Sequence, residues 1–286
     1  MIPPLPPPTE FDRDGGVATL MPRYEDIVQD GRMQLHAFMP GLGAAIWREL
    51  LSKVAAASVF RAQGILPILR RLVIVGEDRP ASVSVPVHYE GSFRFAREKG
   101  GERLFLNMWV EARAAIATTI GPNPPSDAPL ERVGRVFAEH VITRPFAPPG
   151  ERKVTRLDAP GVPPVPDAEH VFDPTEALIE GLPLADAGDI FFGTMHTDSN
   201  QHVNSLVYPR VFEELAVRQL APTPLRHAPL LARSLDIRWR KPFFAGQRAQ
   251  VRMHAPAPVA GATTLTGAFF GDDDPKPHTT LQLILR

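Results

Sequence analysis

The chain has 286 residues, of which 44% are hydrophobic and 22% charged, and its formal net charge is −1. This balance is typical of a globular protein and argues against a general binder of nucleic acids or anionic membrane surfaces. The absence of cysteine excludes a disulfide framework, a thiol nucleophile and a cysteine-ligated zinc site. The length favours two domains or one fused double domain.

The N-terminal segment, residues 1–20, begins MIPPLPPPTEFDRDGG and is rich in proline, which predicts an extended arm. It lacks the basic and apolar regions of a signal peptide, and no apolar run in the chain is long enough to span a bilayer. We therefore expect a cytoplasmic protein without a membrane span.

The first folded unit is predicted over residues 21–146. A short strand candidate at 34–38 leads into a helix over 44–58, where apolar residues recur at helical spacing and charged residues face outward. Four extended runs rich in β-branched and aromatic residues follow and indicate an antiparallel sheet. These runs are Leu69–Val75, Ser82–Arg97, Arg103–Ile116 and Arg132–Ile142.

A proline-rich segment separates this unit from the next one. Between Arg144 and Pro174 lie eight of the chain's 32 prolines, a density that interrupts both helices and strand ladders. We predict a connector laid over the surface, with bounds at residues 147–185, and a second unit over residues 186–286.

In the second unit, apolar residues recur at helical intervals from Val207 to Leu220, with charged residues on the opposite face. Asn204 and Ser205 are good capping residues, and Pro209 is tolerated only in a first turn, so the helix should start near Asn204. Strands are expected near Asp189 and at Leu230–Lys241, Gln247–Pro256, Thr263–Phe270 and His278–Arg286.

The two units align weakly with each other. Setting Ile46–Leu51 over Val211–Ala216 also brings the following strands into approximate register, which indicates an internal duplication. The polar residues that precede the second helix then fall over apolar ones: Asp198, Asn200 and His202 lie over Met33, Leu35 and Ala37. We therefore expect only the second unit to carry a site.

That polar segment runs from Asp198 to Ser205, with the sequence DSNQHVNS, and Tyr208 follows it. At the start of a helix it lies beside unpaired backbone N–H groups and the positive end of the helix dipole, a place that stabilises an anion. The run resembles the D-x-N-x-H-V-N-N-x-x-Y signature of hotdog-fold thioesterases, and most closely that of the acyl-ACP thioesterases. Ser205 replaces the second asparagine of the signature pair.

The resemblance implies an α+β fold, a tandem (double) hotdog in which each repeat is a long helix packed on an antiparallel sheet. The active residues of that family lie in the second repeat, so the first repeat is expected to be non-catalytic. The family also has a carboxylate on the strand after the helix. Here Asp236, on the strand expected at Leu230–Lys241, takes the place of the family's glutamate.

The reaction implied is the attack of water on a thioester carbonyl. We assign Asp236 as the favoured base or nucleophile, with Asp198 as its competitor. His202 would polarise the carbonyl or exchange protons, because imidazole titrates near neutrality, and Asn200 would orient a partner or donate to the oxyanion. The remaining motif residues are assigned to substrate binding: Asn204, Ser205 and Tyr208.

Two residues have plain structural interpretations. Strand alternation places Asp236 on the same face as Arg238 and Arg240, so a solvent-facing ion pair is an equal alternative to catalysis. His196, where many related single-repeat enzymes have a further acid, is expected to be structural.

Five basic residues lie close together in the sequence: Arg233, Arg238, Arg240, Lys241 and Arg248. Such a cluster could bind an acidic carrier protein or a CoA phosphate, but it is more often a solvated rim.

The resulting hypothesis is a thioesterase of lipid metabolism, in fatty acid biosynthesis, that releases a fatty or related acyl group from acyl carrier protein (ACP) or coenzyme A (CoA). The nine histidines show no metal-binding spacing and no dinucleotide or phosphate loop occurs, so neither a metal nor a cofactor is expected. A tandem repeat permits a monomer as well as a homodimer. Two alternatives stay open: a double-hotdog enoyl-thioester hydratase or dehydratase, and a non-catalytic acyl-binding or scaffold protein.

Overall fold

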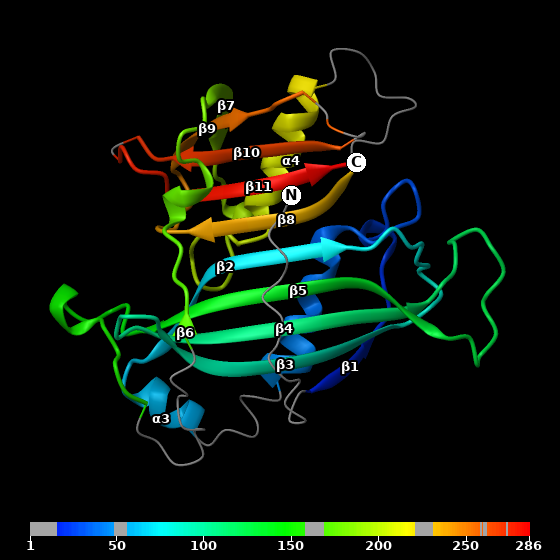
Figure 1. Ribbon diagram of the computed structural model, residues 1–286, viewed down its shortest axis with the longest axis horizontal. Helices are drawn as coiled ribbons and strands as arrows, with labels where there is room; N and C mark the ends of the chain where they lie inside the picture. Colours follow the sequence, from blue (N-terminus) through cyan, green and yellow to red (C-terminus); the bar gives the residue numbers. More distant parts are fainter. Residues whose placement is uncertain are drawn as a thin grey trace. The chain divides into compact units, whose positions relative to one another are not determined.

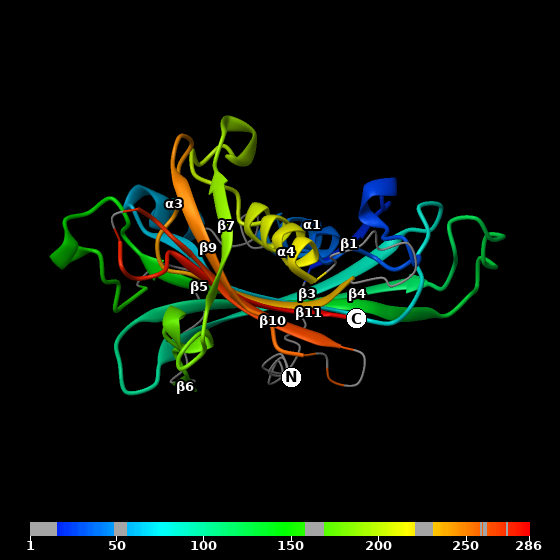
Figure 2. The same cartoon turned by 90° about the horizontal axis from the view of Figure 1, so that it is seen from above.

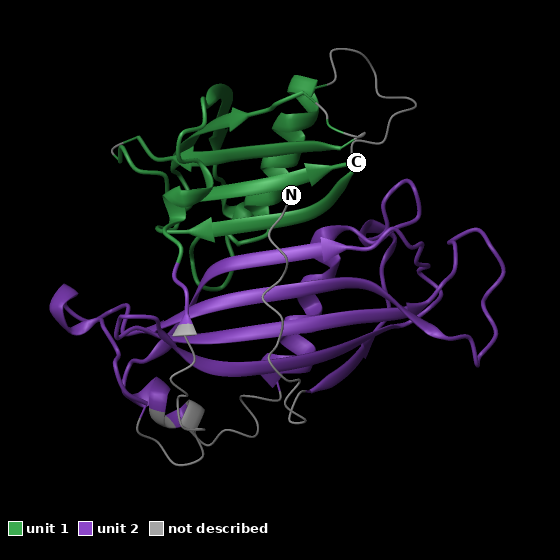
Figure 3. Ribbon diagram, viewed as in Figure 1, with its two compact units in different colours: residues 1–3, 173–286 green, residues 4–172 purple. Residues whose placement is uncertain are grey.

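The computed structural model describes residues 16–48, 56–157, 169–220, 231–257, 259, 262–272 and 274–286. Figure 3 shows its two compact units: unit 2 extends to Phe172, and unit 1 continues from Asp173 to Arg286. Most of the predicted N-terminal arm, and residues 158–168 of the predicted connector, lie outside the described residues.

Unit 2 is a helix-covered antiparallel sheet. Its strands pair in the order β1-β3-β4-β5-β2, and a short strand, β6 (Glu169–His170), pairs parallel with β3. The strands are β1 (Val17–Leu20), β2 (Leu66–Gly76), β3 (Val87–Glu98), β4 (Leu104–Ala115) and β5 (Leu130–Thr143). The helical turns comprise η1 (Tyr24–Asp26), η2 (Leu35–Phe38), α1 (Met39–Gly41), the π-helix η3 (Leu42–Trp47), α3 (Ala56–Ala62) and η4 (Pro149–Glu151).

Unit 1 has the same plan on a smaller scale. Its strands pair antiparallel in the order β7-β9-β10-β11-β8, and α4 lies along one face of them (Figures 1 and 2). The elements are η5 (Thr175–Leu178), β7 (Ala185–Phe191), η6 (Thr194–His196), α4 (Val207–Leu220), β8 (Ala232–Trp239), β9 (Arg248–His254), β10 (Thr263–Phe270) and β11 (Thr279–Leu285).

The two strand orders are identical when each unit is counted in chain order, namely first, third, fourth, fifth, second. In each unit the helical segment lies between the first and second strands of the sequence. This shared order confirms the predicted internal duplication and the α+β class.

A glycine lets a helical aromatic residue approach each sheet closely. A Cβ atom at Gly134 on β5 would overlap the ring of Phe38, and one at Gly267 on β10 would overlap the ring of Phe212. Both rings are fully buried. The helix therefore lies directly on the sheet backbone, and its apolar face forms the core.

Three sequence predictions differ from the structure. Residues 34–38 form a 3-10 turn instead of a strand, because the buried Leu35, Phe38 and Leu42 follow helical spacing. The strand predicted from Ser82 starts only at Val87, since the serine hydroxyls bond within a turn and Pro86 has no N–H to donate. Residues 17–20 of the predicted arm pair with β3 as β1, and the predicted helix over 44–58 is described only in part.

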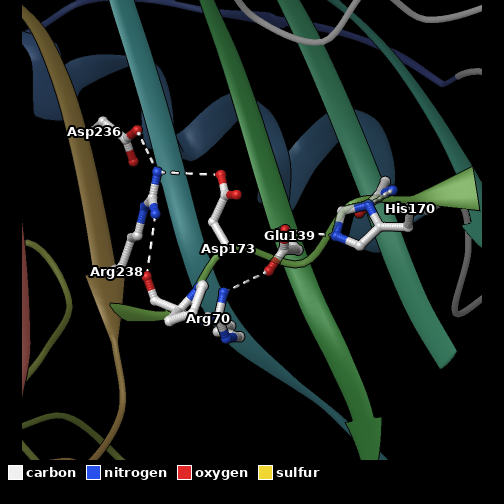
Figure 4. Close-up of polar contacts among 8 residues, drawn as sticks. Arg70, Glu139, His170, Asp173, Asp236 and Arg238 are labelled. Carbon is white, nitrogen blue, oxygen red and sulfur yellow. Dashed lines mark hydrogen bonds and ion pairs between the residues drawn. The ribbon is translucent and has the colours of Figure 1, made fainter. Parts of the chain in front are cut away.

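Polar groups are buried on the sheet face of unit 2 that lies opposite the helix. Glu139 accepts hydrogen bonds from Arg70 at 3.1 Å and from the Nε2 atom of His170 at 2.7 Å, as Figure 4 shows. Burial alone would raise the pKa of Glu139, but these two partners outweigh it and lower the pKa. Phe172 stacks beneath the Arg70 guanidinium, 3.8 Å from the ring centre.

His140 follows Glu139 on β5, so its side chain lies on the other face of the sheet, towards the helix. It is buried against Trp47, with ring centres 5.2 Å apart. Burial lowers the pKa of His140 to about 4. The hydrogen bond with the Leu106 backbone and the charge of Glu139 raise the pKa, but by less than burial lowers it. The folded protein therefore keeps this imidazole neutral where an unfolded chain would protonate it.

We expect the free energy of unfolding to decrease as the pH falls from about 6.5 to about 4, because only the unfolded state binds a proton at His140 in that window. The slope due to this residue is at most about 1.4 kcal/mol per pH unit. Urea titrations across the window should show a flatter profile for His140→Phe and an unchanged one for the control His88→Gln. Equal slopes for all three proteins would contradict the assignment.

Candidate active site

The segment from Gly193 to Asn204 folds into a tight turn that is defined by its own backbone. The N–H of His196 donates to the Gly193 carbonyl at 3.0 Å, and the N–H of Asn204 donates to the His196 carbonyl at 2.9 Å. Within the turn, the N–H of Asp198 donates to the His202 carbonyl at 3.2 Å, and that of Gln201 donates to the Asp198 carbonyl at 2.9 Å. The motif residues are thus gathered in one local structure.

The carboxylate of Asp198 is held at both oxygens. Its Oδ1 accepts the backbone N–H of Asn200 at 2.8 Å, and its Oδ2 accepts the side-chain amide of Asn204 at 3.2 Å. Asp198 is half-buried, while the side chain of Asn200 is exposed. The turn therefore presents an oriented carboxylate next to solvent.

Asn204 also caps α4. Its Oδ1 accepts the N–H of Leu206 at 2.9 Å, and its backbone carbonyl accepts the N–H of Val207 at 3.0 Å. The helix starts at Val207, close to the predicted position, and Pro209 lies in its first turn. The carboxylate and the helix start are accordingly linked through one side chain.

A second segment, Lys241 to Gln247, supports the turn. The N–H of Val203 donates to the Phe243 carbonyl at 2.8 Å, and His202 pairs with Phe244 in an isolated bridge, with ring centres 6.4 Å apart. His202 is half-buried, as is Ser205. The position of the imidazole thus depends on the chain that follows β8.

Tyr208 is fully buried in the first turn of α4. Its hydroxyl oxygen accepts the N–H of Phe243 at 3.3 Å, and its ring packs against Phe269, with ring centres 5.4 Å apart. Burial raises the pKa of Tyr208 to about 12, although its bonds with Phe243 and Thr279 act in the opposite direction. These contacts attach the start of the helix to the Phe243 segment, and the substrate-binding role of Tyr208 stays a prediction.

The strand geometry separates Asp236 from this turn. Trp239 contacts Tyr208 and so marks the face of β8 that packs on α4. Because successive side chains along a strand alternate between its two faces, Asp236 and Arg238 lie on the face opposite α4. The turn lies at the start of α4, so Asp236 points away from it. The structure therefore brings Asp198, Asn204 and the Asn200 backbone together, and does not bring Asp236 to them.

Asp236 is fully buried next to a buried cation. Arg238 approaches its carboxylate at 3.5 Å and also bonds to Asp173 at 3.4 Å and to the Pro174 carbonyl at 3.2 Å (Figure 4). Asp236 thus forms the ion pair that was predicted as the alternative to catalysis, but the pair is buried and does not face solvent.

Two other residues of the predicted basic run, Arg240 and Lys241, pair with Asp274. The hydrogen bond from Arg240 lowers the pKa of Asp274 to about 2. The positive charge of the run is therefore partly neutralised.

Unit 2 contains the same turn earlier in the chain. Each backbone bond has its counterpart: Val28 N–H to the Arg32 carbonyl at 2.8 Å, Gly31 N–H to Val28 at 2.9 Å, and Gln34 N–H to Asp26 at 2.8 Å. The alignment that set Asp198 over Met33 was wrong for this segment, because it was anchored on helix positions and the turn lies out of that register. In the correct register, Val28, Asp30 and Arg32 stand where unit 1 has Asp198, Asn200 and His202.

These substitutions change the chemistry of the turn in unit 2. Val28 has no carboxylate, and Arg32, at the position of His202, forms ion pairs with Asp30 and Asp78. A permanently charged guanidinium between two carboxylates cannot exchange protons near neutral pH. The turn of unit 2 thus keeps the backbone of the site without its acid–base groups.

Among the described residues, no three His, Asp or Glu side chains are grouped so that they could hold a metal ion. The described helices include none that is long and apolar enough to cross a membrane. The site consists of an oriented carboxylate, an imidazole and amide groups at a helix start, a set suited to proton transfer and to the stabilisation of an oxyanion.

Several solved structures are similar to this protein over nearly the whole chain. The TM-score is 0.65 to a putative oleoyl thioesterase from Lactobacillus plantarum (14% identity, covering 95% of each chain). It is 0.59 to an acyl-ACP thioesterase from Bacteroides thetaiotaomicron (10% identity, 97% of this chain and 100% of that one). It is 0.58 to a 12:0-ACP thioesterase from Umbellularia californica (12% identity, 96% and 97%).

At these identities the similarity shows the fold, and the fold is the double hotdog that the motif implied. No protein-family model matches the sequence, and no curated protein is significantly similar to it. The roles of the individual residues therefore depend on the geometry of the turn.

Gln201 is the one non-glycine residue with a positive φ, 67°, in the described chain, and Gly31 occupies the matching position of unit 2 with φ 87°. A left-handed conformation costs a residue with a Cβ atom roughly 1 kcal/mol. We expect Gln201→Gly to leave the stability unchanged or raise it by up to about 1 kcal/mol, and Gln201→Val to lower it by about 1–2 kcal/mol. Thermal denaturation of both variants tests this; a Val variant as stable as the wild type would contradict it.

Proposed function

We propose that this protein hydrolyses acyl thioesters and releases a fatty or related acyl group from ACP or CoA. The observation that carries the proposal is the Asp198 carboxylate, which is held at both oxygens at the start of α4. The likeness of the fold to three proteins named as thioesterases adds support. Assays with both acyl-CoA and acyl-ACP substrates decide between the two carriers.

In this mechanism Asp198 accepts a proton from a water molecule as the water oxygen attacks the thioester carbonyl carbon. The carbonyl oxygen becomes an oxyanion, which the exposed amide of Asn200 and the positive end of α4 stabilise. Collapse of the intermediate breaks the C–S bond, and a protonated His202 gives its proton to the leaving sulfur. Asp198 then releases the proton that it took from water and His202 takes one up, which restores both groups. Water and thioester are thereby converted to a carboxylic acid and a thiol.

The orientation of Asp236 favours Asp198 as the base, because the side chain of Asp236 points away from α4. We propose that the buried Asp236–Arg238 pair stabilises the sheet and takes no part in the reaction. We also propose that unit 2 is non-catalytic, since Arg32 and its two carboxylate partners stand where a proton-exchanging group is needed.

The wild-type protein should release free thiol from at least one member of an acyl-CoA and acyl-ACP panel, measured with a thiol-reactive dye. Asp198→Asn should reduce kcat/KM by about 10³-fold or more, and His202→Ala by about 10²- to 10⁴-fold, because each removes a proton-transfer group. Enoyl-thioester hydration without thiol release would favour the hydratase alternative. Tight acyl binding without turnover would favour the scaffold alternative.

Asp236→Asn separates the two carboxylates. We expect it to keep kcat/KM within about threefold of the wild type while the free energy of unfolding decreases by about 1–3 kcal/mol, because a buried cation loses a charged partner. Parallel kinetic and urea-denaturation measurements test this. A loss of activity comparable to that of Asp198→Asn, with stability retained, would return Asp236 to the catalytic role.

A further inference from the structure

We infer that Asn204 is a positioning residue, whose side-chain amide fixes the Asp198 carboxylate to the start of α4. The inference rests on the proposed function, since it concerns the same site. It replaces the substrate-binding role expected for Asn204 with one that acts through another residue.

The side chain and the backbone of Asn204 both hydrogen-bond to other residues of the turn and of the helix start. The amide nitrogen donates to Asp198 Oδ2 at 3.2 Å, and the amide oxygen accepts the N–H of Leu206 at 2.9 Å. Its backbone N–H and carbonyl bond to His196 and Val207 at 2.9 and 3.0 Å. Both ends of the amide are thus engaged, one on the carboxylate and one on the helix.

This arrangement constrains the carboxylate without covering it. Asn200 and Asn204 each donate one hydrogen bond, one to each oxygen, and each carboxylate oxygen retains a further lone pair that a water molecule can use. Rotation of the carboxylate about its C–C bond would break both bonds. The attacking water is therefore bound by a group whose direction is set before substrate arrives.

In unit 2 the same backbone turn forms without an amide–carboxylate bond. There the same backbone hydrogen bonds form with Val28 at the position of Asp198 and Gln34 at the position of Asn204. Valine offers no carboxylate to hold. The side-chain bond in unit 1 is thus additional to what the turn requires, as expected for a bond that serves the reaction.

The residue type is also informative. Serine, threonine and aspartate all accept a hydrogen bond from the helix N–H groups and cap helices well. Serine and threonine hydroxyls can also donate, but their single oxygen lies nearer the backbone, whereas asparagine has a separate acceptor and a donor one bond further out. Asparagine is therefore the capping residue best suited to cap α4 and hold a carboxylate at the same time.

Two variants separate capping from positioning. Asn204→Ser keeps a capping oxygen but has no amide to reach Asp198, and we expect kcat/KM to decrease by about 10- to 100-fold with little change in KM and in Tm. Asn204→Asp keeps the cap and the size but places a second carboxylate at Asp198. As the pH falls, a proton shared by the two acids restores a hydrogen bond. The activity of Asn204→Asp relative to the wild type should therefore rise as the pH is lowered from about 8 to about 5.

The matched control is Gln34→Ser, the same position of the equivalent turn in unit 2, which should leave both kcat/KM and the pH profile unchanged. The inference is overturned if Asn204→Ser retains kcat/KM within about twofold of the wild type. It is also overturned if Asn204→Asp follows the wild-type pH profile at a constant ratio, since a purely structural defect has no reason to recover in acid.

A readout without turnover keeps this test independent of the proposed function. Three-bond couplings in NMR spectra should show a single χ1 rotamer for Asp198 in the wild type and averaging in Asn204→Ser. If the wild type hydrolyses no thioester but the rotamer result holds, the function is wrong and the positioning stands. A single rotamer in both proteins would overturn the positioning even if the enzyme is active.

Discussion

The packing of a helix directly on a sheet backbone is the constraint on which the candidate site depends. In unit 1, Gly267 leaves room for the Phe212 ring, and Tyr208 is buried near Trp239 and Phe269. Once α4 is fixed in this way, its first turn is fixed as well. The candidate turn is attached to that end through Asn204 and to the Phe243 segment through Val203, so its geometry follows from the core.

The two copies of the turn show how one backbone serves two purposes. Both close with the same hydrogen bonds, and both place a residue with positive φ at the same point. The side chains differ: an oriented carboxylate and an imidazole in one copy, and a guanidinium locked between two carboxylates in the other. The backbone supplies the frame, and two or three side chains decide whether proton transfer is possible.

Two aspartates of unit 1 experience opposite surroundings. Asp198 is half-buried and hydrogen-bonded to neutral donors, so its carboxylate keeps access to water. Asp236 is fully buried beside a cation that is itself bonded to Asp173 and Pro174. A carboxylate enclosed in that way is suited to stabilising a sheet face, whereas one held at the edge of a turn is suited to activating a water molecule.

Most of the strands, the second helix, the duplication and the motif could be predicted from the amino-acid sequence alone. Strand and helix periods are local properties, so the four strands after each helix, the start of α4 and the polar turn could be predicted closely. Alternation along β8 already placed Asp236 on the face of Arg238. Boundaries set by single hydrogen bonds, such as the turn at Ser82 and the 3-10 turn at Leu35, were not predictable in this way.

Which polar groups lie next to one another became clear from the three-dimensional structure. The contact of Trp239 with Tyr208 identified the face of β8 that carries α4, and with it the opposite direction of Asp236. The true register of the two turns, and the bond between Asn204 and Asp198, came from hydrogen bonds that no spacing rule specifies. A sequence period indicates on which face of an element a side chain lies, but its partner on that face is set by packing between segments that are distant in sequence.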